Sequence, residues 1–213
     1  MSLGRLVKQA LGWALPGVVL YRGAPGKAPR LALTFDDGPH PGHTERILEA
    51  LAREGACATF FLQGSEAAKH PALVRAIHEA GHQIGNHGYS HGTPAQLGRR
   101  AFVREVVETQ DLLEAAAGAR LERLFRPPYG TLSLGSFVAL VRRGFRFVFW
   151  SLDSEDSFIR EAGQLQEHLL SGPLRSGDVL LFHEDYAHTI EALPAILSAL
   201  KARSFQLARI ADL

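Results

Sequence analysis

Residues Leu31 to Pro39 read Leu-Ala-Leu-Thr-Phe-Asp-Asp-Gly-Pro, an apolar run that leads directly into two adjacent carboxylates. The run is typical of a buried parallel strand, and Gly38 and Pro39 end it. This places Asp36 and Asp37 at the carboxyl end of a strand, where the loops of an alternating α/β fold form the active site. Successive strand side chains point to opposite faces, so the two acids are expected to differ in role. Taken alone, the stretch fits a polar turn equally well.

The composition of the chain bounds its class. With 213 residues, 46% of them hydrophobic, it can bury a sizeable core, and we expect a single domain over residues 1–213, with residues 1–30 as an N-terminal helix and lead-in segment. The 23 Lys and Arg residues nearly balance the 22 acids without a long block of one sign, which argues against nucleic-acid or anionic-membrane partners. The sole cysteine, Cys57, excludes intrachain disulfides and multi-cysteine metal sites, and we expect a buried thiol.

An apolar segment near the N-terminus, Ala10 to Leu20, follows Arg5 and Lys8. It is too short to cross a bilayer, glycines and a proline interrupt it, and no clear small-residue cleavage site follows. We favour a short helix that packs on the domain. A retained targeting segment is the alternative.

Hydrophobic periodicity predicts helices and strands that alternate along the rest of the chain. Six strands are expected after the first, over residues 58–62, 83–87, 121–126, 145–151, 179–183 and 205–210. Six helices are expected, over residues 43–54, 71–81, 99–117, 136–143, 163–170 and 189–203. Such alternation indicates a parallel sheet, and both an open doubly wound sheet and a barrel satisfy it.

His87 and His91 stand four residues apart after the third expected strand, a spacing that brings both rings to one side of a tight turn. Two histidines and a carboxylate suit zinc or another divalent first-row ion and leave positions open for water and substrate. A lone pair of this kind is weak evidence. Here it falls at the same expected sheet edge as Asp36 and Asp37.

Three further clusters follow strands. Arg126 and Tyr129 come from a loop that two prolines and a glycine make rigid, and an arginine there is suited to orient a carboxylate. A purely structural turn is the alternative interpretation, and it fits Tyr129 better than Arg126. Asp153 and Asp156 follow the fifth strand, and His183 ends the sixth, where it is either a satisfied core residue or poised for proton transfer.

Polar clusters thus follow five expected strands, all at one edge of the sheet, which argues for one functional site. The other histidines fall in expected helices or loops, and we interpret them as solvated. They are His40, His43, His70, His78, His82, His168 and His188.

Five motifs in this order resemble those of the polysaccharide deacetylases, carbohydrate esterase family 4. They are Thr34-Phe35-Asp36-Asp37-Gly38-Pro39, His87-x3-His91, Arg126-Pro127-Pro128-Tyr129, Asp153-x2-Asp156 and Leu181-x-His183. The resemblance implies a distorted (β/α)7 barrel of the NodB-homology type. It also implies removal of acetyl groups from sugars with one divalent metal ion, Zn²⁺ first, with Co²⁺, Ni²⁺ or Mn²⁺ as alternatives.

The resemblance also implies roles for single residues. Asp37, His87 and His91 would hold the metal, Asp36 would be the catalytic base, and His183 the catalytic acid. Arg126 would hold Asp36, and Asp156 would pair with His183. The Tyr129 backbone N–H would donate to the oxyanion of the reaction intermediate. The residues that would contact the substrate are Tyr129, Pro128, Trp150 and Leu181.

Two positions depart from the family pattern. Gly88 stands where Ser or Thr usually follows the first histidine, which removes a hydroxyl that could brace the metal loop. Ser157 stands where a Trp commonly follows the second aspartate, so one aromatic wall of the sugar groove is absent or supplied elsewhere.

The predicted function is deacetylation of an N-acetylated carbohydrate, chitin-like or peptidoglycan glycan, by a monomer without an obligate protein partner. The family resemblance favours the cell envelope or secretion as its location. Rivals are a deacetylase or deformylase of a lipid-linked or small sugar, an Fe(II) oxygenase, and a non-catalytic sugar-binding module. The alternating pattern argues against the oxygenase, and the complete set of acid, base and metal residues argues against the module.

Overall fold

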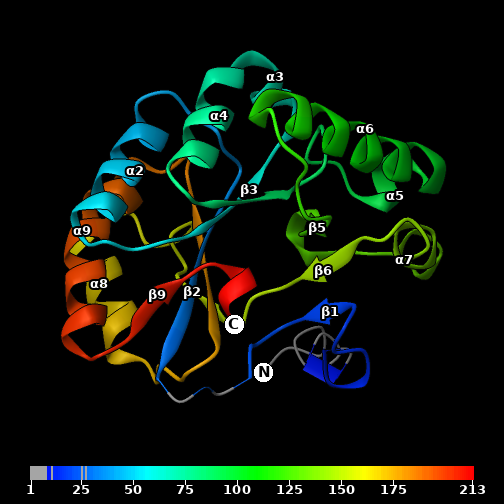
Figure 1. The fold of residues 1–213 in the computed structure, drawn as a ribbon. Coiled ribbons are helices and arrows are strands. Elements are labelled where there is room, and N and C mark those ends of the chain that lie inside the picture. Colours follow the sequence, from blue (N-terminus) through cyan, green and yellow to red (C-terminus); the bar gives the residue numbers. More distant parts are fainter. Residues whose placement is uncertain (1–8, 11, 25, 27) are drawn as a thin grey trace.

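The computed structural model describes residues 9–10, 12–24, 26 and 28–213. In this part of the chain, nine parallel strands form one sheet that curls into a half barrel, with the helices outside it (Figure 1). The strand β2 (Arg30–Asp36) is its centre. It pairs with β8 (Asp178–His183) on one side. On the other side it pairs with β9 (Gln206–Ala208) through its first half and with β3 (Thr59–Leu62) through its second half.

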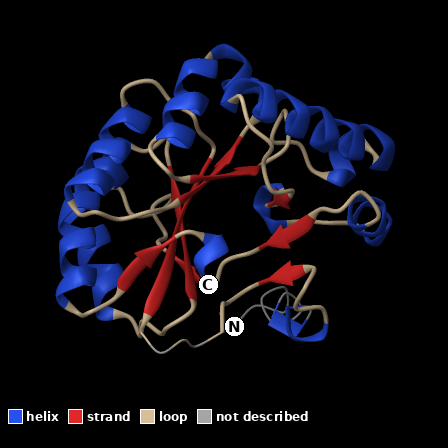
Figure 2. Cartoon of the chain, viewed as in Figure 1, coloured by secondary structure: helices blue, strands red, loops and turns tan. Residues whose placement is uncertain are grey.

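The remaining strands continue the sheet outward from β2. Beyond β3 lie β4 (Gln83–Asn86), β5 (Leu124–Phe125), β6 (Arg146–Val148) and β1 (Val19–Leu20), and beyond β8 lies β7 (Leu152–Asp153). Figure 2 shows the strands gathered inside an arc of helices. Because every pairing is parallel, the carboxyl ends of all these strands meet at one edge.

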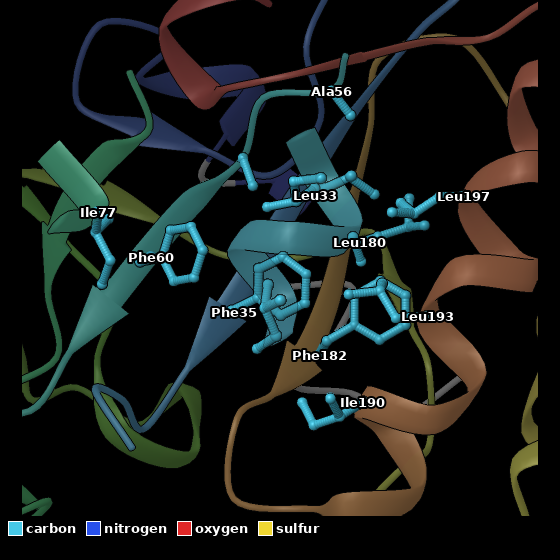
Figure 3. Close-up of a cluster of buried hydrophobic side chains, with 14 of the residues drawn as sticks. Leu33, Phe35, Ala56, Phe60, Ile77, Leu180, Phe182, Ile190, Leu193 and Leu197 are labelled. Atoms are coloured by element: carbon cyan, nitrogen blue, oxygen red, sulfur yellow. The ribbon is translucent and has the colours of Figure 1, made fainter. Parts of the chain in front are cut away.

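The side chains of β2 alternate between two environments. Leu31, Leu33 and Phe35 point outward into the core between sheet and helices, part of which Figure 3 shows. Ala32 points into the barrel, where it clusters with apolar residues of neighbouring strands. The same alternation directs Asp36 inward at the carboxyl end.

The helices pack on the outer face of the sheet. They are α2 (His43–Arg53), α3 (Gly64–Lys69), α4 (Pro71–Glu79), α5 (Pro94–Leu97), α6 (Arg99–Ala117), α7 (Leu134–Val141), α8 (Ala162–Ser171) and α9 (Ala187–Ala202), with short 3-10 turns η1 (Pro128–Gly130) and η2 (Ile210–Asp212). The longest, α6, ends at Gly118, whose φ of 69° provides the left-handed turn that ends many helices. Ile210 of η2 reaches the apolar interior of the barrel.

All six predicted helices and seven predicted strands are present, with boundaries that differ by up to three residues. The strand expected over residues 145–151 is only Arg146–Val148, and the strand expected over 121–126 is only Leu124–Phe125. The sequence did not predict α3, α5, β1 or β7. The two strands have two residues each, too few for a hydrophobic period to appear.

The N-terminal segment differs from the prediction of a packed helix. Residues 12–14 are helical, but the Trp13 side chain is 88% exposed, and Val19–Leu20 form strand β1 beside β6. The parts of the predicted N-terminal helix and lead-in segment over residues 1–8, 11, 25 and 27 lie outside the described residues. Cys57 is half-buried rather than buried. No helix in the described part of the chain is both long and apolar enough to span a membrane.

Candidate active site

The pair of acids lies where β2 ends. Asp36 is the last residue of the strand and stands opposite His183, the last residue of β8. Asp37 follows with a φ of 74°, so the chain turns sharply between the two carboxylates. Gly38 completes the turn against the Glu184 carboxyl group, which a Cβ at position 38 would meet at 2.0 Å. Position 38 therefore requires glycine, because a side chain there would collide with Glu184.

Asp37, His87 and His91 bring three ligand atoms within 4.8 Å of one another. Asp37 Oδ1 lies 3.6 Å from His87 Nε2 and 3.3 Å from His91 Nε2. Gln63 Nε2 donates a hydrogen bond of 2.7 Å to the same Asp37 oxygen and orients it. These elements reach one point because Gln63 follows β3 and His87 follows β4, both at the edge where β2 ends.

Each of the two histidines directs its Nε2 atom toward the Asp37 carboxylate. His87 Nδ1 donates to the Arg126 carbonyl oxygen over 2.7 Å, which leaves the lone pair on Nε2, the atom that faces Asp37. Burial and the neighbouring His87 ring lower the pKa of His91. Burial raises the pKa of Asp37, but the charges of His87 and His91 outweigh it and leave that pKa below its usual value. Two imidazole nitrogens and one carboxylate fit a zinc-type divalent ion with open positions.

The loop that carries the histidines is braced without the hydroxyl that Gly88 lacks. Asn86 Oδ1 accepts a hydrogen bond of 2.8 Å from the Gly88 N–H, and Asn86 Nδ2 donates to the Val106 carbonyl of α6. The Gly88 carbonyl accepts from the Gly64 N–H at 2.8 Å. Gly88 has a φ of 81°, a conformation that glycine adopts without strain. The buried amide of Asn86 therefore holds this loop in place.

Asp36 is held from inside the barrel by Arg126. The guanidinium is wholly buried and donates to Asp36 Oδ1 at 2.7 Å and to Thr34 Oγ1 at 2.8 Å. Its central carbon also lies 4.1 Å from the centre of the Phe61 ring. A buried arginine requires a partner charge, and the Asp36 carboxylate provides it. The second Asp36 oxygen lies 3.7 Å from His87 Nε2, on the side of the Asp37–His87–His91 group.

His183 is fixed by Asp156. His183 Nδ1 donates to Asp156 Oδ1 at 2.7 Å, and the His183 backbone N–H donates to Oδ2 at 2.8 Å. Thr189 Oγ1 also donates to Asp156, and Asp156 is fully buried. Burial lowers the pKa of His183, but the Asp156 hydrogen bond and nearby carboxylate charges raise it overall, to about 9. The imidazole is therefore protonated at neutral pH and points its Nε2 away from Asp156.

A cavity of about 700 Å³ opens over Asp36, His87 and His183, and most of the residues predicted to touch substrate line it. Tyr129, Trp150 and Leu181 line it, as predicted. Pro128 is buried and absent from the lining, whereas Pro127 lines it. Among the described residues no acceptor is found for the Tyr129 backbone N–H. That N–H is therefore available to a substrate oxygen.

Several residues at the site were not predicted. His43 Nδ1 donates to the Glu184 carbonyl at 2.7 Å, and His188 Nε2 donates to the Asp156 carbonyl at 2.8 Å. The interpretation of these histidines as solvated is wrong, because tertiary contacts bring them to loops distant in sequence. It is also wrong for His82, which is buried, accepts from the Ala58 N–H and has its pKa lowered by burial to about 4.

Glu184 is the other residue that the sequence did not reveal. Its carboxyl group is fully buried, accepts from Thr44 Oγ1 at 2.5 Å, and leaves Oε1 without a partner among the described residues. Burial raises the pKa of Glu184 to about 8, so the group is mostly protonated at neutral pH. Its position directly after His183 was the only available signal.

The comparisons with known proteins agree with this geometry. A family model described as polysaccharide deacetylase matches residues 23–148. The peptidoglycan-N-acetylglucosamine deacetylase PgdA of Listeria monocytogenes is 32% identical over 184 residues, 86% of this chain and 38% of that protein. The chitooligosaccharide deacetylase of Sinorhizobium fredii is 31% identical over 191 residues, 84% of this chain and 88% of that protein.

A solved structure shares the fold. The family 4 carbohydrate esterase of Streptomyces lividans, in complex with acetate, is 35% identical with a TM-score of 0.77, covering 86% of this chain and 93% of that one. The match confirms the prediction of a distorted barrel of the NodB-homology type. This chain spans little more than a third of the length of the Listeria relative. Its sequence and fold together show that it belongs to the polysaccharide deacetylase family, carbohydrate esterase family 4.

Proposed function

We propose that this chain is a metal-dependent deacetylase that hydrolyses the acetamide of an N-acetylated glycan. One observation carries the proposal. Asp36 and His183, opposite each other on β2 and β8, flank the Asp37–His87–His91 cluster, and each has its own buried partner. A carboxylate and a protonated imidazole on two sides of one cavity are a base and an acid in position for hydrolysis.

Asp36 is suited to be the base. Arg126 occupies one of its oxygens, so the carboxylate cannot rotate, and the other oxygen faces the cluster. A divalent ion held there would polarise the acetyl carbonyl and acidify the attacking water. Asp36 would accept the proton of that water. Asp37 is placed differently, because its Oδ1 faces both imidazoles and it is suited to be a ligand.

His183 is suited to be the acid. The leaving nitrogen of an amide must gain a proton before it departs, and the protonated His183 ring would donate it from Nε2. The bond to Asp156 at Nδ1 fixes the ring orientation and favours the protonated form. The free Tyr129 N–H would donate to the oxyanion of the tetrahedral intermediate, and Leu181 and Trp150 would contain the acetyl methyl group.

The names of the relatives support a glycan substrate. The Listeria protein is named for peptidoglycan N-acetylglucosamine and the Sinorhizobium protein for chitooligosaccharides. Both of these glycans contain acetamido sugars. We propose N-acetylglucosamine units in one of these polymers as the substrate class. A lipid-linked or small acetylated or formylated sugar is the alternative, and the open cavity accommodates the same acetamide chemistry.

Acetate release tests the proposal. Metal-free protein would be reloaded with Zn²⁺, Co²⁺, Ni²⁺ or Mn²⁺ and incubated with N-acetylated chitooligosaccharides, peptidoglycan fragments and N-formyl analogues. We expect acetate from an oligosaccharide only after reloading. The Asp36→Asn protein, assayed alongside, should retain metal and release acetate at least about a hundredfold more slowly. A wild-type protein that binds metal and leaves every substrate intact would overturn the proposed function.

A further inference from the structure

Phe158 lies uncovered at the rim of the candidate active site. Its side chain is 81% exposed, although it is aromatic and lines the cavity above Asp36 and His183. A large exposed apolar side chain beside a catalytic cavity commonly marks a ligand surface, because water contact with it is unfavourable. Phe158 follows Ser157 directly, and both residues line this cavity.

The residues on both sides of Phe158 are held by contacts with other parts of the chain. On one side, Asp156 is buried and bonded to His183, and its carbonyl accepts from His188 Nε2. On the other side, Ile159 packs against the main core. The Phe158 and Ile159 N–H groups both donate to the Glu155 carbonyl at 2.9 Å. These contacts hold the backbone of the turn in place, with the Phe158 side chain exposed on it.

The other aromatic side chains of the cavity already have partners. The Tyr186 ring stacks on His188 at 5.4 Å and has the Arg160 guanidinium 5.4 Å from its centre. Tyr129 packs edge-on against His91 at 4.6 Å. No ring or cation partner of Phe158 is found in the described part of the chain. Its faces are available to a ligand.

We propose that Phe158 is the stacking platform for a second sugar ring, adjacent in the chain to the acetylated residue, so that the enzyme selects oligosaccharides over single N-acetylated sugars. This inference rests on the proposed function. The apolar C–H face of a pyranose packs well on an aromatic ring. A cavity of about 700 Å³ also has room for more than one acetamido group.

The loop geometry explains why a second sugar would improve turnover as well as binding. Phe158 stands two residues after Asp156, the residue that orients His183. His183 protonates the nitrogen that remains on the sugar, so the sugar lies on the acid's side of the cavity. A ring stacked on Phe158 would hold that nitrogen at a fixed position relative to His183 Nε2.

The kinetic test compares chain lengths. The kcat/KM for acetate release would be measured on N-acetylglucosamine and on its β-1,4-linked dimer to pentamer, with wild type, Phe158→Ala, Phe158→Tyr and Leu134→Ala. Leu134 is the matched control, since it is 79% exposed and lies outside the cavity lining. We expect the oligomer-to-monomer ratio of kcat/KM to fall about tenfold in Phe158→Ala, through a raised KM and a lowered kcat on the oligomers, and to be retained in Phe158→Tyr and Leu134→Ala. An unchanged ratio in Phe158→Ala would overturn the inference.

A binding measurement separates this inference from the proposed function. Titration calorimetry of the tetramer would use the Asp36→Asn protein with and without Phe158→Ala, so that no turnover interferes. We expect the second substitution to weaken the Kd about tenfold. If wild type proves inactive on all glycans while this loss is observed, the proposed function fails and the sugar platform stands. If wild type is active and the Kd is unchanged, the platform fails and the function stands.

Discussion

The two halves of β2 face different interiors within the same barrel. At Ala32 the space is filled by Val148, Val179, Ile210 and other apolar side chains. At Thr34 and Asp36 it is filled by the guanidinium of Arg126. The apolar half stabilises the fold through burial, and it places no ligand. The polar half carries the chemistry, and each of its charges requires a buried partner, which the rigid apolar half keeps in register.

The largest effect is expected when a metal ligand is removed beside the polar half of β2. His87→Ala and His91→Ala should each lose the divalent ion and all deacetylase activity, because two of three protein ligands cannot hold it tightly. Metal content after dialysis would be measured by atomic emission, with His82→Ala, a buried histidine away from the site, as the control. Full metal occupancy in the His87 and His91 variants would refute the ligand assignment.

The next effect separates the two acids of the turn. Asp36→Asn should keep the metal and lower kcat by about 10² to 10⁴, the usual contribution of a general base. Asp37→Asn should lose metal and activity together, since its Oδ1 faces both imidazoles. Metal analysis beside steady-state kinetics decides the point. Loss of metal in the Asp36 variant alone would exchange the two roles.

The apolar half of the comparison is tested through stability. Leu33 is fully buried in the core between sheet and helices, so Leu33→Ala should lower the free energy of unfolding by about 2 to 5 kcal/mol. Metal stoichiometry should not change at temperatures where the variant is folded. Urea unfolding measures the first quantity, with the exposed Leu134→Ala as reference. A folded variant with a lost metal site would mean that the two halves are not separable.

A smaller effect concerns the pH range of activity. Asp156 opposes the effect of burial and raises the pKa of His183 to about 9. Asp156→Asn removes that charge, so the pKa of His183 should fall and the alkaline limb of kcat/KM should move to lower pH. NMR titration of the His183 ring in metal-free protein gives a second measurement of the same shift. If the alkaline limb of kcat/KM and the pKa of the His183 ring are both unchanged in Asp156→Asn, Asp156 does not tune the acid.

The last predicted effect concerns how the free energy of unfolding depends on pH through the buried Glu184. Its pKa in the folded chain, about 8, lies above the unfolded value near 4.5, so the native state holds a proton that the unfolded state releases in this window. This contribution therefore favours folding below pH 4.5 and is lost as pH rises to 8, by at most about 1.4 kcal/mol per pH unit. Glu184→Gln should remove that slope. Urea unfolding midpoints of wild type and Glu184→Gln would be measured from pH 5 to 8. If the two midpoints change with pH in the same way, Glu184 is not buried as a neutral acid.

The sequence predicted the parts of the site that are local. Asp36 and Asp37 follow an unbroken apolar run, and His87 and His91 lie within one short loop, so their placement needed only the strand ends. Arg126 was expected to hold Asp36, and the structure brings them to 2.7 Å. Chain order placed Arg126 at the same edge as Asp36, because parallel strands present their carboxyl ends at one edge, and the family resemblance supplied the pairing itself.

The residues that the sequence missed act through contacts between distant segments. Glu184 accepts from Thr44, 140 positions earlier, and His188 donates to Asp156 across 32 positions. Neither residue stands in a pattern that periodicity could detect, and His43 and His188 look like solvated helix-end residues until the loops meet. The short strands β1 and β7 were missed for a related reason, since only pairing with β6 and β8 defines them.

The sequence by itself determined the strand-helix alternation, the edge at which the site lies and the family of the chain, because hydrophobic period and ordered motifs are local properties of the chain. Tertiary structure alone decided the protonation of His183, the burial of Glu184 as a neutral acid and the outward position of Phe158. Those three properties depend on which groups surround a side chain and how far water is excluded from it. Packing between segments far apart in the sequence fixes both conditions.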